Sequence, residues 1–290
     1  MNWSGTSIDA SHSVEAEQFE PGLADEEQAH AHLLNLEVRD LTLQARIGVT
    51  ERVGLEFEMP YRQVRVEADF EGSGGERRED FVSIHHRTET VSGLGDISLY
   101  ARFRLTRPLA GGRWVVDVLS GVAVPTGDTE PDPFELGEEG HQHQHIFFGT
   151  GTYDPLLGVE VYHPSSSLPT AGWLRLRTPV SENSFGYRAG ARVSAGIAVN
   201  PSLGVASWSF LGQLELYHEE PSRWDDRNAR NSGRTDLIGN LGVFWTPAAA
   251  WDLHVVVKIP ENLSSRGGQL ELSPTVSVGG SYSVSLRARG

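Results

Sequence analysis

The segment QLELSPTVSVGGSYSVSL, residues 269–286, decides the fold because its apolar and polar residues alternate almost without a break. A β-strand places successive side chains on opposite faces, so this segment has one apolar face and one polar face. The same alternation recurs in ISLYARFRL at 97–105 and in WDLHVVVKI at 251–259. Apolar residues spaced as in an amphipathic helix are almost absent. The sequence therefore predicts an all-β protein.

Eleven segments with this alternation follow one another along the chain. They predict strands at 32–49, 52–70, 94–106, 113–126, 155–163, 170–180, 186–199, 203–218, 235–246, 251–260 and 268–287. Short connections follow the odd-numbered strands, and longer polar ones mostly follow the even-numbered strands. A meander with tight turns at one rim and long loops at the other is typical of an outer-membrane β-barrel. Such a barrel must close, because lipid offers no hydrogen-bond partner to a free strand edge.

An odd number of strands conflicts with the even numbers of bacterial single-chain barrels. We therefore expect a further strand that ends at residues 1–3, with the polar run 4–30 as the first long loop. No secretory signal follows Met1 in MNWSGTSIDA, so we also expect a natural start upstream, with an export signal and the rest of that strand. The prediction is a single antiparallel, up-and-down transmembrane β-barrel of about twelve strands over residues 1–290. Within it, residues 1–31 form a polar N-terminal segment and 32–287 the barrel strands.

Two early strands change phase. In the first, apolar residues fall on even positions up to Val38 and on odd positions from Leu41, and the next strand slips near Pro60. One extra residue in each strand, a β-bulge, would keep the apolar side chains on one face. We therefore predict bulges near Asp40 and Pro60.

Composition excludes several classes of protein. The 290 residues contain no cysteine, and 24 Lys+Arg against 39 Asp+Glu give a net charge of −15. The acidic balance argues against nucleic-acid binding, and the missing cysteine removes disulfides and thiolate zinc sites. No stretch approaches the roughly 18 apolar residues of a transmembrane helix. No nucleophile elbow or Walker-type loop is present, so we expect neither an enzyme nor a cofactor.

Three segments carry a resemblance to a known family: GLGDISLYARFRL at 93–105, VAVPTGD at 122–128 and GTGTYDPLLGVEVY at 149–162. They resemble the outer-membrane proteins of the MetA-pathway phenol-degradation family, and the resemblance covers residues 1 to about 286. It implies a porin-like barrel in the outer membrane of a Gram-negative cell, among lipid and lipopolysaccharide, that transports small solutes, hydrophobic or aromatic ones included. The motifs are Gly/Asp turns at strand–loop junctions, so they specify architecture more than transport chemistry.

If the apolar parity faces lipid, the opposite parity lines the lumen. That face interleaves both signs of charge, and we expect ion pairs across it because a buried unpaired charge is costly. The charges could pack a nearly filled barrel, or they could form a channel wall that selects solutes. The expected lumen-lining residues are Arg39, Arg46, Glu56, Glu58, Arg102, Arg104, Asp117, Arg175, Arg177, Arg192, Glu215 and Lys258.

The run HQHQH at 141–145 is a candidate metal site. On an extended segment its three imidazoles point one way, and neutral imidazole is a common ligand of Zn, Cu and Ni. A solvated, acidic, histidine-bearing loop is the alternative. The candidate ligands of a divalent metal are His141, His143 and His145.

Three functional hypotheses follow. The first is an outer-membrane channel for small solutes. The second is a non-conducting outer-membrane barrel whose histidine- and acid-rich surface loops bind metal ions or a partner. The third is a soluble ligand carrier whose apolar parity points inward, so that it purifies without detergent.

Overall fold

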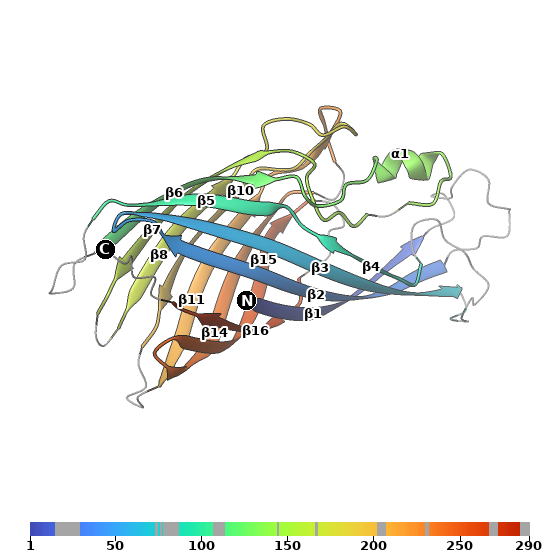
Figure 1. Ribbon diagram of the computed structural model, residues 1–290. Helices are drawn as coiled ribbons and strands as arrows, with labels where there is room; N and C mark the ends of the chain where they lie inside the picture. The colour runs from blue at the N-terminus through green and yellow to red at the C-terminus, as the bar shows by residue number, and fades with distance from the viewer. Residues whose placement is uncertain are drawn as a thin grey trace.

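The computed structural model describes residues 1–14, 30–72, 75, 77, 87–106, 114–143, 145–165, 168–201, 207–229, 232–266 and 272–284. Its strands form one closed antiparallel barrel, which confirms the predicted up-and-down fold (Figure 1). The strands of the barrel sheet are β1 (Asn2–Val14), β2 (His30–Gly48), β3 (Val53–Gly72), β4 (Glu89–Leu94), β5 (Ile97–Arg104), β6 (Val115–Val124), β7 (Asp154–His163), β8 (Thr170–Arg177), β10 (Arg192–Val199), β11 (Trp208–Glu219), β14 (Arg234–Ala248), β15 (Trp251–Ser265) and β16 (Thr275–Tyr282).

The sheet has thirteen strands, but β4 and β5 share one position in the wall. Both pair with β3: β5 lies along its first half and β4 along its second half. The barrel therefore has twelve positions, the number predicted. It closes where β1 pairs with β16, from Asn2 opposite Gly279 to Gly5 opposite Val276. This pairing satisfies backbone groups that would otherwise be left unbonded in lipid.

The long loops carry the little structure that lies outside the barrel. Helix α1 (Pro133–Glu138) follows β6, and within the described ranges no helix has the length and apolarity of a membrane span. A small second sheet joins β9 (Tyr187–Arg188), β12 (Arg223–Trp224) and β13 (Arg227–Asn228). The strand predicted at 186–199 is thus divided, because β9 leaves the wall to pair with β12.

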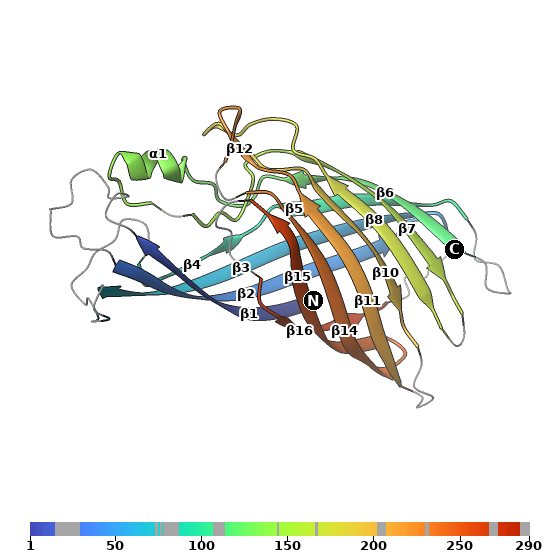
Figure 2. The same ribbon diagram turned by 180° about the vertical axis from the view of Figure 1, so that it is seen from behind.

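The first strand is longer than the sequence predicts. Residues from 4 onward were predicted to form a loop, whereas β1 continues to Val14 by pairing with β2 up to His30. Figures 1 and 2 show β1, β2 and β3 extending together beyond the rest of the barrel. A strand outside the lipid needs no apolar face, so this part of β1 lacks the alternation by which strands are recognised.

The outer face of the barrel is a continuous apolar belt. Leu99 of β5 and Val257 of β15, on opposite sides of the barrel, are 42% and 37% exposed. The belt contains large side chains from nearly every strand: Leu55, Leu99, Phe103, Leu157, Leu174, Ile197, Leu214, Leu241, Val257 and Val276. Apolar area in water costs about 25 cal/mol per Å², and a patch of this extent marks a membrane surface. The hypothesis of a soluble carrier with an apolar interior is therefore wrong.

An aromatic girdle borders this belt at the rim with the short turns. Trp208 of β11 stacks on Trp245 of β14, with ring centroids 5.7 Å apart, and Trp251 of β15 lies 4.7 Å from Tyr282 of β16. All four side chains are exposed on the outer face. Trp and Tyr concentrate at the membrane–water interface, so the girdle marks one edge of the lipid layer.

The predicted bulges near Asp40 and Pro60 are wrong. Strands β2 and β3 stay paired without a register shift, from His30 opposite Gly72 to Gly48 opposite Gly54. Outward positions are therefore polar from Asn35 to Arg39 and apolar from Leu41 on. The apolar residues change parity at Asp40 because the outer face of this unbroken strand meets water on the side of Arg39 and lipid on the side of Leu41.

Candidate functional site

The inner face between β3 and β8 is organised around Arg102. This guanidinium donates to Glu56 of β3, to Asp117 of β6 at 3.0 Å and to Glu160 of β7 at 2.6 Å. Arg104 forms two hydrogen bonds with the same Asp117, at 2.9 and 3.0 Å, and Arg175 of β8 pairs with Glu160. We call these six side chains, Glu56, Arg102, Arg104, Asp117, Glu160 and Arg175, the paired wall.

The paired wall is electrically balanced and partly buried, with Arg104 38% and Arg175 33% exposed. Three guanidinium groups face three carboxylates, and the side chain of Asp117 is only 7% exposed. Removing one partner of such a buried pair leaves an uncompensated charge and is strongly destabilising. The wall therefore holds five strands together and contributes no net charge to the interior.

A second cluster lies at the long-loop end of this wall. Arg177, at the end of β8, donates to Asp96 at 2.7 Å and to Asp154 at 2.6 Å. Thr150 donates its backbone N–H and its hydroxyl to Asp96, at 2.9 and 3.0 Å, and the hydroxyl of Thr152 donates to Asp154 at 2.5 Å. We call Asp96, Thr150, Thr152, Asp154 and Arg177 the mouth cluster.

The mouth cluster joins the three motifs on which the family resemblance rests. Asp96 comes from the first motif and Asp154 from the third, while Gly127 of the second donates its N–H to Asp96 at 3.2 Å. The backbones approach so closely that a Cβ on Gly149 would lie 2.5 Å from Asp96 Oδ1 and from the Gly127 carbonyl oxygen. Glycine is needed there for that reason. The cluster fastens both ends of the long loop after β6 to the barrel.

The opposite wall, formed by β11, β14 and β15, is arranged differently. Glu215 and Lys258 lie there on the inner face, and Gln213 donates to Glu215 at 3.4 Å. Within the described ranges, no carboxylate oxygen lies within 4.0 Å of the Lys258 ammonium. A carboxylate and an ammonium thus face the interior of this wall without an ion pair to each other.

Aromatic rings also lie on the inner face, packed flat over glycines. Trp173 covers its cross-strand partner Gly196, where a Cβ would lie 2.3 Å from the ring. His254 covers Gly279 in the same way, at 2.4 Å, and its ring is tilted by 30° against that of Phe244, with centroids 4.9 Å apart. Each glycine lets a ring lie against the backbone, and the other face of that ring is turned toward the interior.

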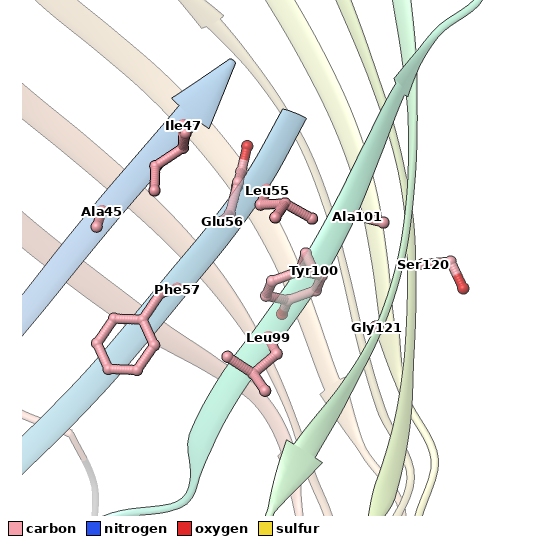
Figure 3. Close-up of a pocket in the computed structure, with 10 residues that line it drawn as sticks. All are labelled: Ala45, Ile47, Leu55, Glu56, Phe57, Leu99, Tyr100, Ala101, Ser120 and Gly121. Carbon is pink, nitrogen blue, oxygen red and sulfur yellow. The ribbon is translucent and has the colours of Figure 1, made fainter. Parts of the chain in front are cut away.

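A shallow apolar hollow of about 480 Å³ belongs to the outer face. Figure 3 shows it over β2, β3, β5 and β6, with Ala45, Leu55, Phe57 and Leu99 among the residues that line it. These residues are part of the lipid-facing belt. Glu56 and Tyr100, which occupy inner-face positions, also contribute to its lining.

Arg39 does not line the interior as predicted. It shares the outward parity of Leu43 and Ile47 on an unshifted strand, its side chain is 51% exposed, and it pairs with Glu37 at 2.5 Å. The prediction failed because it assumed a bulge that β2 does not contain.

The other predicted lumen residues lie on inner-face positions. Arg46 lies 3.4 Å from Glu56, and Glu58 accepts a hydrogen bond from Gln44 at 2.9 Å. Arg192 lies 3.3 Å from Glu219. The paired wall holds Glu56, Arg102, Arg104, Asp117 and Arg175, the mouth cluster holds Arg177, and the opposite wall holds Glu215 and Lys258.

Asp96, Thr150 and Asp154 were absent from the predicted interior residues. They stand at strand ends, where alternation carries no information about which face a side chain takes. Their one signal was the recurrence of Gly–Asp and Gly–Thr pairs in the three family-like motifs.

The histidine run is not assembled as a metal site in the described part of the chain. His143 is buried and its Nδ1 lies 2.8 Å from the His141 carbonyl oxygen, while its ring is 5.0 Å from that of His145. His141 points instead to Glu139, at 3.3 Å. No group of three His, Asp or Glu side chains among the described residues is placed to hold a metal ion. Metal binding by this loop stays a prediction.

Comparison with known proteins adds a likeness in fold. No protein-family model and no curated protein matches the chain, so membership of the MetA-pathway family stays a prediction. Among solved structures, the COG4313 outer membrane channel from Pseudomonas putida F1 matches 96% of this chain and 92% of its own, with a TM-score of 0.60 and 13% identity. Two other barrels are more distant. The match to a KdgM porin covers 97% of this chain and 100% of the porin, with a TM-score of 0.39 and 11% identity. The match to OmpT of Vibrio cholerae covers 97% of this chain and 96% of OmpT, with a TM-score of 0.41 and 7% identity. At 13% identity, the first likeness shows that this chain has the fold of an outer-membrane β-barrel.

Proposed function

We propose that this protein is an outer-membrane channel that passes small hydrophobic or aromatic solutes through its interior. The observation that supports this most directly is a closed barrel with an apolar outer belt and a polar inner face, the distribution found in barrels that enclose a pathway through lipid. The solved structure with a TM-score of 0.60 is itself an outer membrane channel.

The inner face supports the solute class. The paired wall neutralises its own charges, so a neutral solute meets no strong field along it. Rings such as Trp173 and Phe244 offer apolar contact in the same interior. Aromatic side chains attract other rings by stacking, which favours solutes that contain one.

Uptake into liposomes tests this function. The purified protein is reconstituted in lipid vesicles, and entry of benzyl alcohol and of glucose is followed by vesicle swelling, with protein-free vesicles as the baseline. We expect faster entry of benzyl alcohol with protein than without it, and a smaller gain for glucose. Equal rates in both kinds of vesicle, together with no conductance in planar bilayers, would reject a channel.

A further inference from the structure

Lys258 is the one lysine in the 290-residue sequence, in which every other basic side chain besides histidine is arginine. It lies in the middle of β15, between Val257 and Ile259, which are exposed on the outer belt. Alternation along the strand therefore turns Lys258 to the interior, where it is partly exposed. A flexible, strongly hydrated ammonium thus stands on the inner face.

This ammonium forms no hydrogen bond and no ion pair within 4.0 Å in the part of the chain that the structure describes, and Asp236 is near enough only for a longer-range attraction. The carboxylate on the neighbouring strand, Asp236, is already saturated by Arg234 at 2.6 and 2.9 Å and by Asn262 at 2.8 Å. On the paired wall, by contrast, every guanidinium group meets a carboxylate. The charge of Lys258 therefore remains available to a mobile anion.

Neutral hydrogen-bonding groups flank the ammonium on both sides. Asn240 of β14 and Thr275 of β16 are its cross-strand partners, and directly opposed residues share a face. Asn240 is buried, and its amide forms no hydrogen bond to the described residues. One cation and one free amide thus converge from adjacent strands, next to a hydroxyl.

Apolar side chains lie beside this polar pair, together with Gln213, the β11 residue opposite Asn240, and Glu215, opposite Ile238. Ile238 and Val256 are inner-face neighbours on the same two strands. His254 lies four residues before Lys258 on β15, about 13 Å away at 3.3 Å per residue, with Phe244 of β14 beside it. An amphipathic solute could place its charged end at the ammonium and its apolar part along these side chains.

We propose that Lys258 and Asn240 bind the carboxylate of small amphipathic monoanions inside the barrel. One ammonium with one amide matches a single negative charge, whereas phosphate groups favour several cations and the arginine fork. The site deepens the proposed channel function by naming a solute class that a neutral interior would not favour.

Labelling tests binding without relying on transport. Because Lys258 is the one lysine, an amine-reactive acylating reagent modifies it and the amino terminus alone, and the amino-terminal peptide serves as the internal reference in mass spectrometry. We expect benzoate to slow acylation of Lys258, while benzyl alcohol of similar shape leaves it unchanged. In Asn240→Ala the protection by benzoate should weaken. Equal acylation rates with and without benzoate would overturn the proposal.

Transport in vesicles tests the functional consequence. We expect Lys258→Gln to reduce benzoate uptake about tenfold, the effect of losing one charge-assisted hydrogen bond, and Lys258→Arg to retain most of it. Benzyl alcohol uptake should be equal in all three proteins. A parallel fall for both solutes would overturn the site, because it would show a steric effect. If neither solute passes through the wild-type protein, the channel fails, and the labelling result alone decides whether the site binds carboxylates.

Discussion

Replacing Arg177 with methionine should destabilise the barrel more than any change to an exposed ion pair. The side chain lies between Asp96, 5% exposed, and Asp154, which is fully buried. Its three hydrogen bonds to these carboxylates measure 2.6, 2.7 and 2.8 Å. Methionine keeps much of the side-chain length but offers neither charge nor a donor.

The expected loss follows from what remains after the substitution. Two buried carboxylates keep only the Thr150 and Thr152 hydroxyls and two backbone N–H groups as donors. Breaking a buried ion pair from one side costs about 3–5 kcal/mol. We therefore expect a reduction of that size in the free energy of unfolding. Adding Asp154→Asn to Arg177→Met removes one orphaned charge and should recover part of the loss.

Urea unfolding of the protein in lipid vesicles measures this effect, with the fluorescence of the seven tryptophans as the signal. Arg39→Met is the matched control, because Arg39 forms an exposed pair of a kind worth about 0–1 kcal/mol. If Arg177→Met unfolds within 1 kcal/mol of the wild type, as Arg39→Met should, the reasoning about the mouth cluster fails.

Three further outcomes are expected. Leu99→Arg should lower the free energy of unfolding in vesicles by about 2–4 kcal/mol, whereas Leu99→Met should change it little. A smaller loss for Leu99→Arg would place the residue outside the lipid. Gly196→Val should displace the Trp173 ring, which would lower the melting temperature and alter the near-ultraviolet circular dichroism. The control Gly212→Ala, on the next strand, has room for its methyl group and should change neither measurement. Calorimetric titration with Zn, Cu and Ni should give equal heats before and after triple alanine substitution, since no three His, Asp or Glu side chains among the described residues are placed to hold a metal ion. A smaller heat in the variant would establish the metal site at His141, His143 and His145.

The sequence was sufficient for the architecture because alternation is imposed directly by the two environments of a barrel wall. One face of a strand such as β15 meets lipid and the other meets the polar interior, so the polarity of each residue indicates the face on which it lies. From such strands the number of wall positions and the inner-face position of Lys258 could be predicted.

Alternation fails where one of the two environments changes. The apolar parity at Asp40 would shift in the same way whether the strand contained a bulge or passed from lipid into water. The unbroken pairing of β2 with β3 shows that the second explanation is correct. The outer part of β1 was missed for the same reason. The mouth cluster needed information that no local pattern contains, because Asp96 and Arg177 are 81 residues apart in sequence.

The extent of the apolar belt has a practical consequence for the choice of lipid. On β15 the uninterrupted run of outward apolar positions extends from Trp251 to Ile259, and Glu261 separates it from Leu263. Eight steps of 3.3 Å give about 26 Å along the strand, or about 20 Å across the bilayer at a tilt near 40°. A typical hydrocarbon core is about 30 Å thick, and each ångström of mismatch costs a fraction of a kcal/mol. The protein should therefore insert and stay folded most readily in bilayers of short acyl chains, and long-chain lipids would have to thin around it.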